Sequence, residues 1–153
     1  MDTAIFLDIL KDEFRPLQEI FYSALSAKET LMVPVIVFAE LLPQFGGDRA
    51  LVASFLKDHK IEIFPLDIEG TIIAGRRWMK YLSKKTKAQC PHCGRTLSQK
   101  THLLSDFYIG GFALAHCDSI LTRDRGIYRK YFGDLKGYGG CLDKNVATPL
   151  NEA

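Results

Sequence analysis

The pattern of apolar and polar positions is clearest between Leu103 and Phe132, in the last third of the chain. Its spacing predicts a helix that begins at Ser105, a short buried strand over 119–122 and a second helix. Ser105 is expected to cap the first helix, so that Asp106 falls in its first turn. Asp124 follows the strand and leaves the carboxyl edge of a parallel sheet, where α/β proteins bind their ligands. Two carboxylates are therefore predicted at one rim.

The first of these helices is rich in small residues, which are expected to let it pack closely against a sheet. These residues are Gly110, Gly111, Ala113 and Ala115.

The rest of the chain alternates between the two kinds of pattern. Apolar residues at helical spacing predict helices over 4–11, 16–25, 35–42, 48–59 and 68–85, whereas short apolar runs predict strands over 30–33 and 61–64. One last edge strand is expected after residue 136. This alternation predicts a doubly wound α/β domain with parallel strands.

Glu40 departs from the pattern around it, because its neighbours are valines, leucines and a phenylalanine. A solvated helix face would carry other polar residues one turn away. A carboxylate in apolar surroundings must be paired or bound to a metal, since burying it alone costs several kcal/mol. A metal ion and a salt bridge to Arg49 or another base are both open interpretations.

Four carboxylates lie where a predicted strand ends and the next helix begins. In a parallel α/β topology these junctions are expected at one edge of the sheet. The four carboxylates are Asp2, Glu40, Asp106 and Asp124. Each alone has a plain role, as a surface charge, a helix-start residue or a turn former. Together they repel one another unless a divalent cation neutralises them, and oxygen ligands favour Mg²⁺ or Mn²⁺ over zinc. Such an ion can activate water towards a phosphodiester, and either Thr122 or Arg123 can position the scissile phosphate.

Length and composition narrow the class of protein. The chain has 153 residues, 47% of them hydrophobic, which fits a single domain over residues 1–153 with a sizeable core. The net charge of +2 neither requires nor excludes a nucleic-acid partner. The longest apolar run, 31–42, is too short to span a bilayer, and no secretion signal is recognised. Four cysteines in such a chain indicate a reducing, cytoplasmic location.

Motifs in order along nearly the whole chain carry a family resemblance. They are DTAIFLDIL at 2–10, VPVIVFAELL at 33–42, DFYIGGFALA at 106–115 and LTRD at 121–124. Together they resemble the PIN-domain family, and within it the VapC-type toxins of type II toxin–antitoxin pairs. The resemblance implies a three-layer α/β/α fold with a central parallel sheet, a Mg²⁺- or Mn²⁺-dependent endoribonuclease, a homodimer and a cognate antitoxin that inserts a segment into the acidic cleft.

The same resemblance assigns roles to individual residues. It makes Asp2, Glu40, Asp106 and Asp124 the metal-binding acids, and Thr122 matches the small hydroxyl residue that stands two positions before the last acid. Two positions depart from the family pattern. Only Met1 precedes Asp2, so the first strand is apparently truncated, and Ala4 replaces the family's usual Asn or Ser. Both departures bear on the strength of metal binding.

An insert at about 88–102 interrupts the PIN outline and contains Cys90-Pro91-His92-Cys93-Gly94. This pattern is typical of a zinc knuckle, which supplies two of the four ligands that a structural Zn²⁺ needs. His102 is the third candidate ligand, Cys141 and His92 remain open, and Cys117 is too far along its helix. The alternatives are a Cys₄ site shared by two protomers and a metal-free surface loop.

Basic residues flank the insert and can either guide an RNA backbone or form a solvated helix face. They are Lys80, Lys84, Lys85, Lys87, Arg95 and Lys100. Trp78 and the tyrosines are interpreted as core packing. Two rival functions stay open beside the toxin: a housekeeping RNA-processing or structure-specific DNA nuclease, and a non-catalytic zinc-knuckle interaction module.

Overall fold

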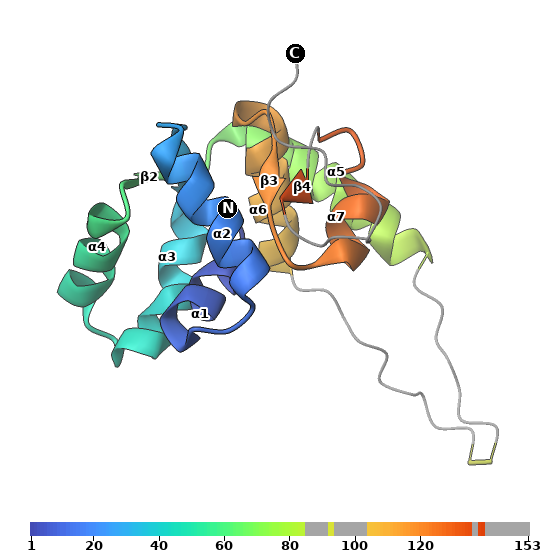
Figure 1. Ribbon diagram of the computed structural model, residues 1–153. Helices are drawn as coiled ribbons and strands as arrows, with labels where there is room; N and C mark the ends of the chain where they lie inside the picture. Colours follow the sequence, from blue (N-terminus) through green and yellow to red (C-terminus); the bar gives the residue numbers. More distant parts are fainter. Residues whose placement is uncertain (85–91, 94–103, 136–137, 140–153) are drawn as a thin grey trace.

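Helices and strands alternate along the chain in the computed structural model, which describes residues 1–84, 92–93, 104–135 and 138–139 (Figure 1). The elements are α1 (Thr3–Lys11), α2 (Arg15–Ser26), β1 (Leu31–Pro34), α3 (Val35–Leu41), the 3₁₀ helix η1 (Leu42–Phe45), α4 (Arg49–Asp58), β2 (Ile61–Phe64), α5 (Ile68–Lys84), α6 (Leu104–His116), β3 (Ile120–Leu121), α7 (Arg125–Tyr131) and β4 (Tyr138–Gly139). No helix of these described ranges combines the length and apolarity needed to cross a bilayer.

The described strands pair in parallel. β1 lies beside β2, with Leu31 opposite Ile61 and Pro34 opposite Phe64, and β3 lies beside β4. The predicted α/β class with a parallel sheet is therefore confirmed.

The first two residues connect the two strand pairs through their backbones. The Met1 nitrogen donates to the carbonyl oxygen of Met32 in β1 at 3.0 Å. The Asp2 N–H donates to the carbonyl oxygen of Leu121 in β3 at 2.9 Å. Asp2 is thereby held at the point where the two pairs approach each other.

Aspartates begin several helices. The Asp48 carboxylate accepts from the N–H groups of Ala50 and Leu51 at the start of α4, and the Asp67 carboxylate accepts from the N–H of Gly70 in the first turn of α5 at 3.0 Å. For α6 the expected cap is wrong. This helix begins at Leu104, so Ser105 lies inside its first turn rather than before it. Asp106 is nevertheless in the first turn.

The small residues of α6 serve a contact between helices, which corrects the expectation that they pack against a sheet. A Cβ atom placed on Gly111 would lie 2.3 Å from the carbonyl oxygen of Gly70 and 2.9 Å from the Cβ of Ala74, both in α5. A Cβ on Gly110 would lie 2.7 Å from the ring of Phe132. The sequence pattern shows which face is small but not which element covers it.

An aromatic cluster completes the packing between α5, α6 and α7. The ring of Trp78 lies 5.0 Å from those of Tyr81 and Phe107, and the ring of Phe107 lies 5.8 Å from that of Phe132. The interpretation of Trp78 as a packing residue is confirmed. The cluster fixes the position of α6, which carries Asp106.

Gly111→Ala is expected to lower the free energy of unfolding by about 1–3 kcal/mol, since the new methyl group meets backbone atoms of α5 that cannot turn aside. The matched control is Gly75→Ala in α5, where an added Cβ has no neighbour within 4 Å. The control should raise the free energy by about 0.5–1 kcal/mol, because alanine favours the helix. Urea titrations measure both changes, and equal effects of the two substitutions would contradict the close contact.

Candidate functional site

Asp2 and Thr122 form the innermost part of the site. Asp2 directly precedes α1, and Thr122 directly follows β3, so the backbone bond between Asp2 and Leu121 brings them together. The Thr122 hydroxyl donates to Asp2 Oδ2 at 2.6 Å, and both residues are buried. Thr122 Oγ1 also accepts from the backbone N–H of Asp124 at 3.0 Å. One hydroxyl group thus connects the first and the last of the predicted acids.

Asp124 begins α7. Its Oδ1 accepts from the backbone N–H groups of Gly126 at 2.7 Å and Ile127 at 3.3 Å. Asp124 therefore follows the strand, as the sequence predicts, and also caps the next helix. The positive end of the helix dipole favours a carboxylate at this place.

Glu40 lies half-buried in α3 and is bound by the first turn of α1. The Thr3 hydroxyl donates a hydrogen bond to Glu40 Oε2. Glu40 and Arg49 are both described, and the structure shows no ion pair between them. Of the two interpretations of Glu40, the salt bridge to Arg49 is therefore not formed. The observed polar partner of Glu40 is the neutral hydroxyl group of Thr3, which directly follows Asp2.

The buried carboxyl group of Asp2 has a shifted pKa, and the charge of Asp106 contributes to the shift. The pKa of Asp2 is raised from 3.8 to about 6. Burial is the largest cause, the hydrogen bond from Thr122 opposes the shift, and the charge of Asp106 adds to it. Burial also raises the pKa of the Tyr128 phenol well above 10, and the charges of all four predicted acids add to this shift. The structure thus brings Asp2, Glu40, Asp106 and Asp124 within electrostatic reach of one buried hydroxyl group; their role as metal ligands stays a prediction.

The donor set has the chemistry of a hard cation, since it consists of carboxylate and hydroxyl oxygens. Among the residues that the structure describes, however, no group of three or more His, Cys, Asp or Glu side chains is placed so that it could hold a metal ion. Mg²⁺ commonly keeps several of its waters and is bound through one or two carboxylates. The described acids thus form no closed cage of carboxylates, and their role as metal ligands stays a prediction.

The sequence did not predict an ion pair between Arg123, in the loop after β3, and Asp8 in α1. Arg123 Nη1 donates to Asp8 Oδ1 at 2.7 Å, and the Asp8 side chain is only 3% exposed. Asp8 Oδ2 has no partner among the described residues, and burial raises the pKa of Asp8 despite the nearby guanidinium. Asp8 stands in an apolar run, as Glu40 does, and that signal could have found it.

Tyr128 is the second residue that the sequence reasoning missed. Its side chain is fully buried, and its hydroxyl group has no hydrogen-bond partner among the described residues. Such a group costs roughly 1–3 kcal/mol and calls for an explanation. The available signal was its spacing, because Tyr128 follows Asp124 by four residues on α7.

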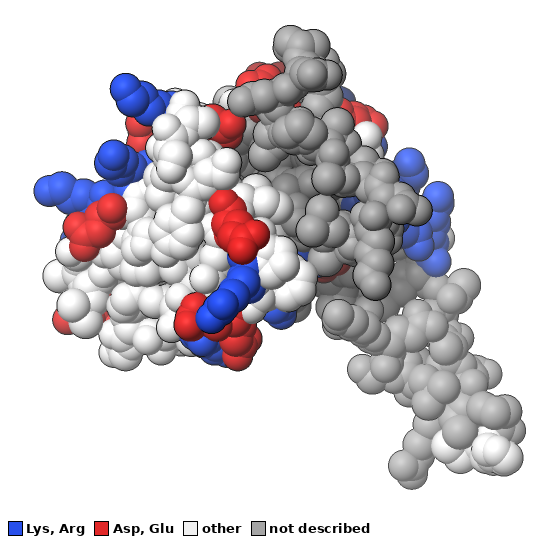
Figure 2. Space-filling model, in the orientation of Figure 1, with Lys and Arg blue, Asp and Glu red and all other residues white. Residues whose placement is uncertain are grey.

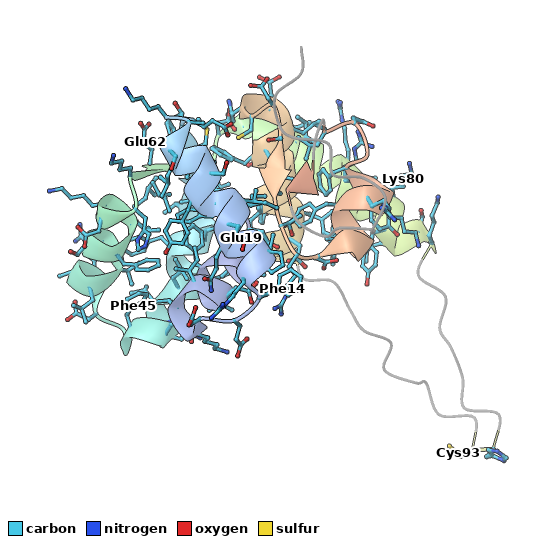
Figure 3. The ribbon with its side chains drawn as sticks, viewed as in Figure 1. Phe14, Glu19, Phe45, Glu62, Lys80 and Cys93 are labelled. Carbon is cyan, nitrogen blue, oxygen red and sulfur yellow. The ribbon has the colours of Figure 1, made fainter. Side chains whose placement is uncertain are left out.

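Other predicted residues lie away from the acids or outside the described ranges. Cys93 and His92 are exposed, and Figure 3 shows Cys93 far from the helical body. Lys80 and Lys84 are exposed near the end of α5. Figure 2 shows Lys and Arg side chains in this region, and Lys80 is labelled in Figure 3. The remaining predicted zinc ligands and basic residues lie outside the described residues: Cys90, His102, Cys141, Lys85, Lys87, Arg95 and Lys100.

The elements are those of an α/β domain with parallel strands. Asp124 lies between β3 and α7 as expected, whereas Asp2 precedes α1 without a described strand before it, Glu40 lies within α3 and Asp106 lies in the first turn of α6. The sequence model of the PIN domain matches residues 1–133. The chain belongs to the PIN-domain family, whose members are typically metal-dependent nucleases, and nuclease activity follows as the general function. Comparison with curated proteins gives no match, and neither does comparison with solved structures.

Arg123→Ala is expected to lower the free energy of unfolding by about 1–3 kcal/mol, since it leaves the buried Asp8 carboxylate without its cation. The control is Arg77→Ala, which breaks an ion pair with the largely exposed Asp134 and should cost under about 1 kcal/mol. Denaturant titrations at neutral pH compare the two, and a larger loss in the control would contradict the bridging role of Arg123.

In the presence of a chelator, the free energy of unfolding is expected to fall as the pH rises, because of Asp2. The folded-state pKa of about 6 lies above the ordinary value of 3.8, so the stability contributed by protonated Asp2 is complete below about pH 4 and is lost through about pH 6. Relative to Asp2→Asn, the wild type should lose up to about 3 kcal/mol between about pH 4 and pH 8. Unfolding curves of both proteins test this, and a pH-independent difference would refute it.

Proposed function

We propose that the protein is a Mg²⁺- or Mn²⁺-dependent endoribonuclease that hydrolyses RNA phosphodiester bonds and acts as the toxin of a toxin–antitoxin pair. The single observation that carries the nuclease site is that two hydroxyl groups join acids from separate parts of the chain, Thr122 contacting both Asp2 and the backbone of Asp124, and Thr3, next to Asp2, contacting Glu40. Membership of the PIN-domain family supports phosphodiester chemistry at this place. The motif similarity to VapC-type toxins supports the RNA substrate and the toxin role.

The acids would hold the divalent ion, and the charge of Asp106 already acts on the Asp2 carboxyl group. When bound, the ion neutralises the carboxylates and lowers the pKa of water that attacks phosphorus. The chain's own part is positioning. Thr122 fixes the Asp2 carboxylate and the backbone of Asp124 at once, and Thr3 fixes Glu40. These hydroxyl groups keep the acids in place without adding positive charge, which would weaken cation binding.

Arg123 is the proposed contact for the substrate's phosphate. Its side chain is 46% exposed, and the bond from Nη1 to Asp8 fixes one part of the guanidinium. Guanidinium groups bind phosphate through paired N–H donors. Lys80 and Lys84 add positive charge at the exposed end of α5, which supports an extended RNA backbone crossing that side.

The proposed partners and the second metal follow from the family resemblance and the insert. A cognate antitoxin would restrain the toxin through a segment that enters the acidic cleft, and the toxin would form a homodimer. Cys90 and Cys93 would bind structural Zn²⁺, with His102 as a third ligand or with the matching pair of a second protomer. Metal analysis of protein purified without chelator tests the zinc proposal, and a preparation without zinc would end it.

Asp106→Asn and Asp124→Asn should each reduce Mg²⁺- or Mn²⁺-dependent cleavage of structured RNA by more than the roughly 10- to 100-fold that loss of an outer-shell partner costs. Each substitution keeps the shape of the side chain and removes a negative charge that the cation requires. Initial rates on labelled RNA give the measurement. The matched control is Asp118→Asn at an exposed position after α6, which should cleave as the wild type does.

Undiminished cleavage by both site variants would refute the proposed site. Matched RNA and DNA substrates in the same assay separate an endoribonuclease from a DNA nuclease. Absence of cleavage by the wild type on every substrate, together with absence of Mn²⁺ binding, would support a non-catalytic module instead.

A further inference from the structure

One face of α5 carries large apolar side chains that remain exposed. Ile68 is 79% exposed, Ile72 47%, Met79 69% and Leu82 48%. Single exposed apolar residues are common, whereas a continuous patch of them usually marks an interaction site. We call these four residues, together with Gly75 between them, the α5 stripe.

The spacing of the α5 stripe is that of a contact between two helices. From Ile68 to Leu82 its members follow one another at intervals of four, three, four and three residues. This is the repeat of a coiled-coil seam, in which the side chains of one helix fit between those of another. At a rise of about 1.5 Å per residue the seam is about 20 Å long.

The opposite face of α5 packs inside the domain. Gly70 and Ala74 lie against Gly111 of α6, and the ring of Tyr81 lies 5.6 Å from that of Phe107 (Figure 1). The α5 stripe therefore does not serve the contact with α6, and this side of the helix is open to a partner.

Charged residues beside the α5 stripe favour a second copy of the same helix as that partner. Glu69 and Arg76 are exposed, and each directly follows a member of the stripe, so both lie on the same flank. The residues that directly precede members of the stripe, on the other flank, are the uncharged Thr71 and Trp78.

The distribution of these charges also favours one orientation of the two copies. In an antiparallel pair of helices the same flanks face each other, whereas in a parallel pair each flank faces the opposite one. Antiparallel packing brings Glu69 of each copy towards Arg76 of the other, and parallel packing leaves both charges beside uncharged residues. The α5 stripe is thus complementary to itself, as a contact across a two-fold axis requires.

We propose that the α5 stripe is the contact between two copies of this chain, which pack their α5 helices antiparallel across a two-fold axis near the middle of the helix. This inference deepens the proposed function, on whose homodimer it rests, by naming the surface that the two protomers share. The acids of the candidate site take no part in this contact.

Ile72→Glu should raise the dissociation constant of the dimer by more than about 100-fold, because each dimer would bury two charges without partners. Sedimentation equilibrium over a concentration series measures it, and the wild type should approach twice the 17.2 kDa of one chain. The matched control is Leu51→Glu, since Leu51 is 54% exposed on α4 and the variant should sediment as the wild type does. Circular dichroism checks that both variants keep their helices.

Charge reversal tests the orientation. Glu69→Arg and Arg76→Glu should each weaken the dimer, because each places like charges side by side, and the double variant should restore the affinity. A double variant that is weakened by the sum of the two single effects would overturn the antiparallel contact.

A wild type that sediments as a single chain over the whole series would overturn the inference, and so would an Ile72→Glu variant that dimerises as tightly as the wild type. The nuclease activity is judged separately. Cleavage of RNA by a monomeric wild type that is lost in Asp106→Asn would refute the shared surface and support the nuclease, whereas a dimer through α5 without cleavage would do the reverse.

Discussion

Burial of the Asp2 carboxyl group is the constraint on which the candidate site depends. Asp2 is buried, carries a raised pKa and feels the charge of Asp106, so the fold keeps these groups together at a cost. The cost is met by neighbouring elements, because the backbones of Met1 and Asp2 bind both strand pairs and the hydroxyl groups of Thr122 and Thr3 hold two of the acids. A divalent cation at this place, as proposed above, would offset the repulsion between the acids.

Much of the fold could be predicted from the sequence, because local spacing of apolar residues determines helices and strands. The strand over 61–64 and the helix after Pro34 were found at their observed positions, and Asp106 falls in the first turn of α6 as expected. The errors concern partners rather than elements. Ser105 does not cap α6, and Gly111 meets α5 instead of a sheet, since a one-dimensional pattern shows a small face without its neighbour.

The candidate site was predictable to a different degree. Asp124 follows β3 and begins α7, as its place after an apolar run predicts. The expectation that all four acids stand at junctions between strands and helices is wrong for Asp2, Glu40 and Asp106, because the pattern of apolar residues does not fix where each helix lies in the fold. Asp8 and Tyr128 do not stand out in the sequence, since their importance depends on burial and on contacts between residues that are far apart along the chain, such as the 115 positions between Asp8 and Arg123. The role of Thr3 could not be predicted either, because its hydroxyl group binds Glu40, which lies on another helix.

The close approach of Gly111 to Gly70 has a consequence for how this domain tolerates change. The two helices are locked by backbone contact and by the aromatic rings of Trp78 and Phe107, so their register does not depend on the segment that joins them. The cost of closing a connecting loop grows only slowly with its length. A change in the length of the segment between α5 and α6 is therefore expected to leave Asp106 in its position, because the contact with α5 holds α6.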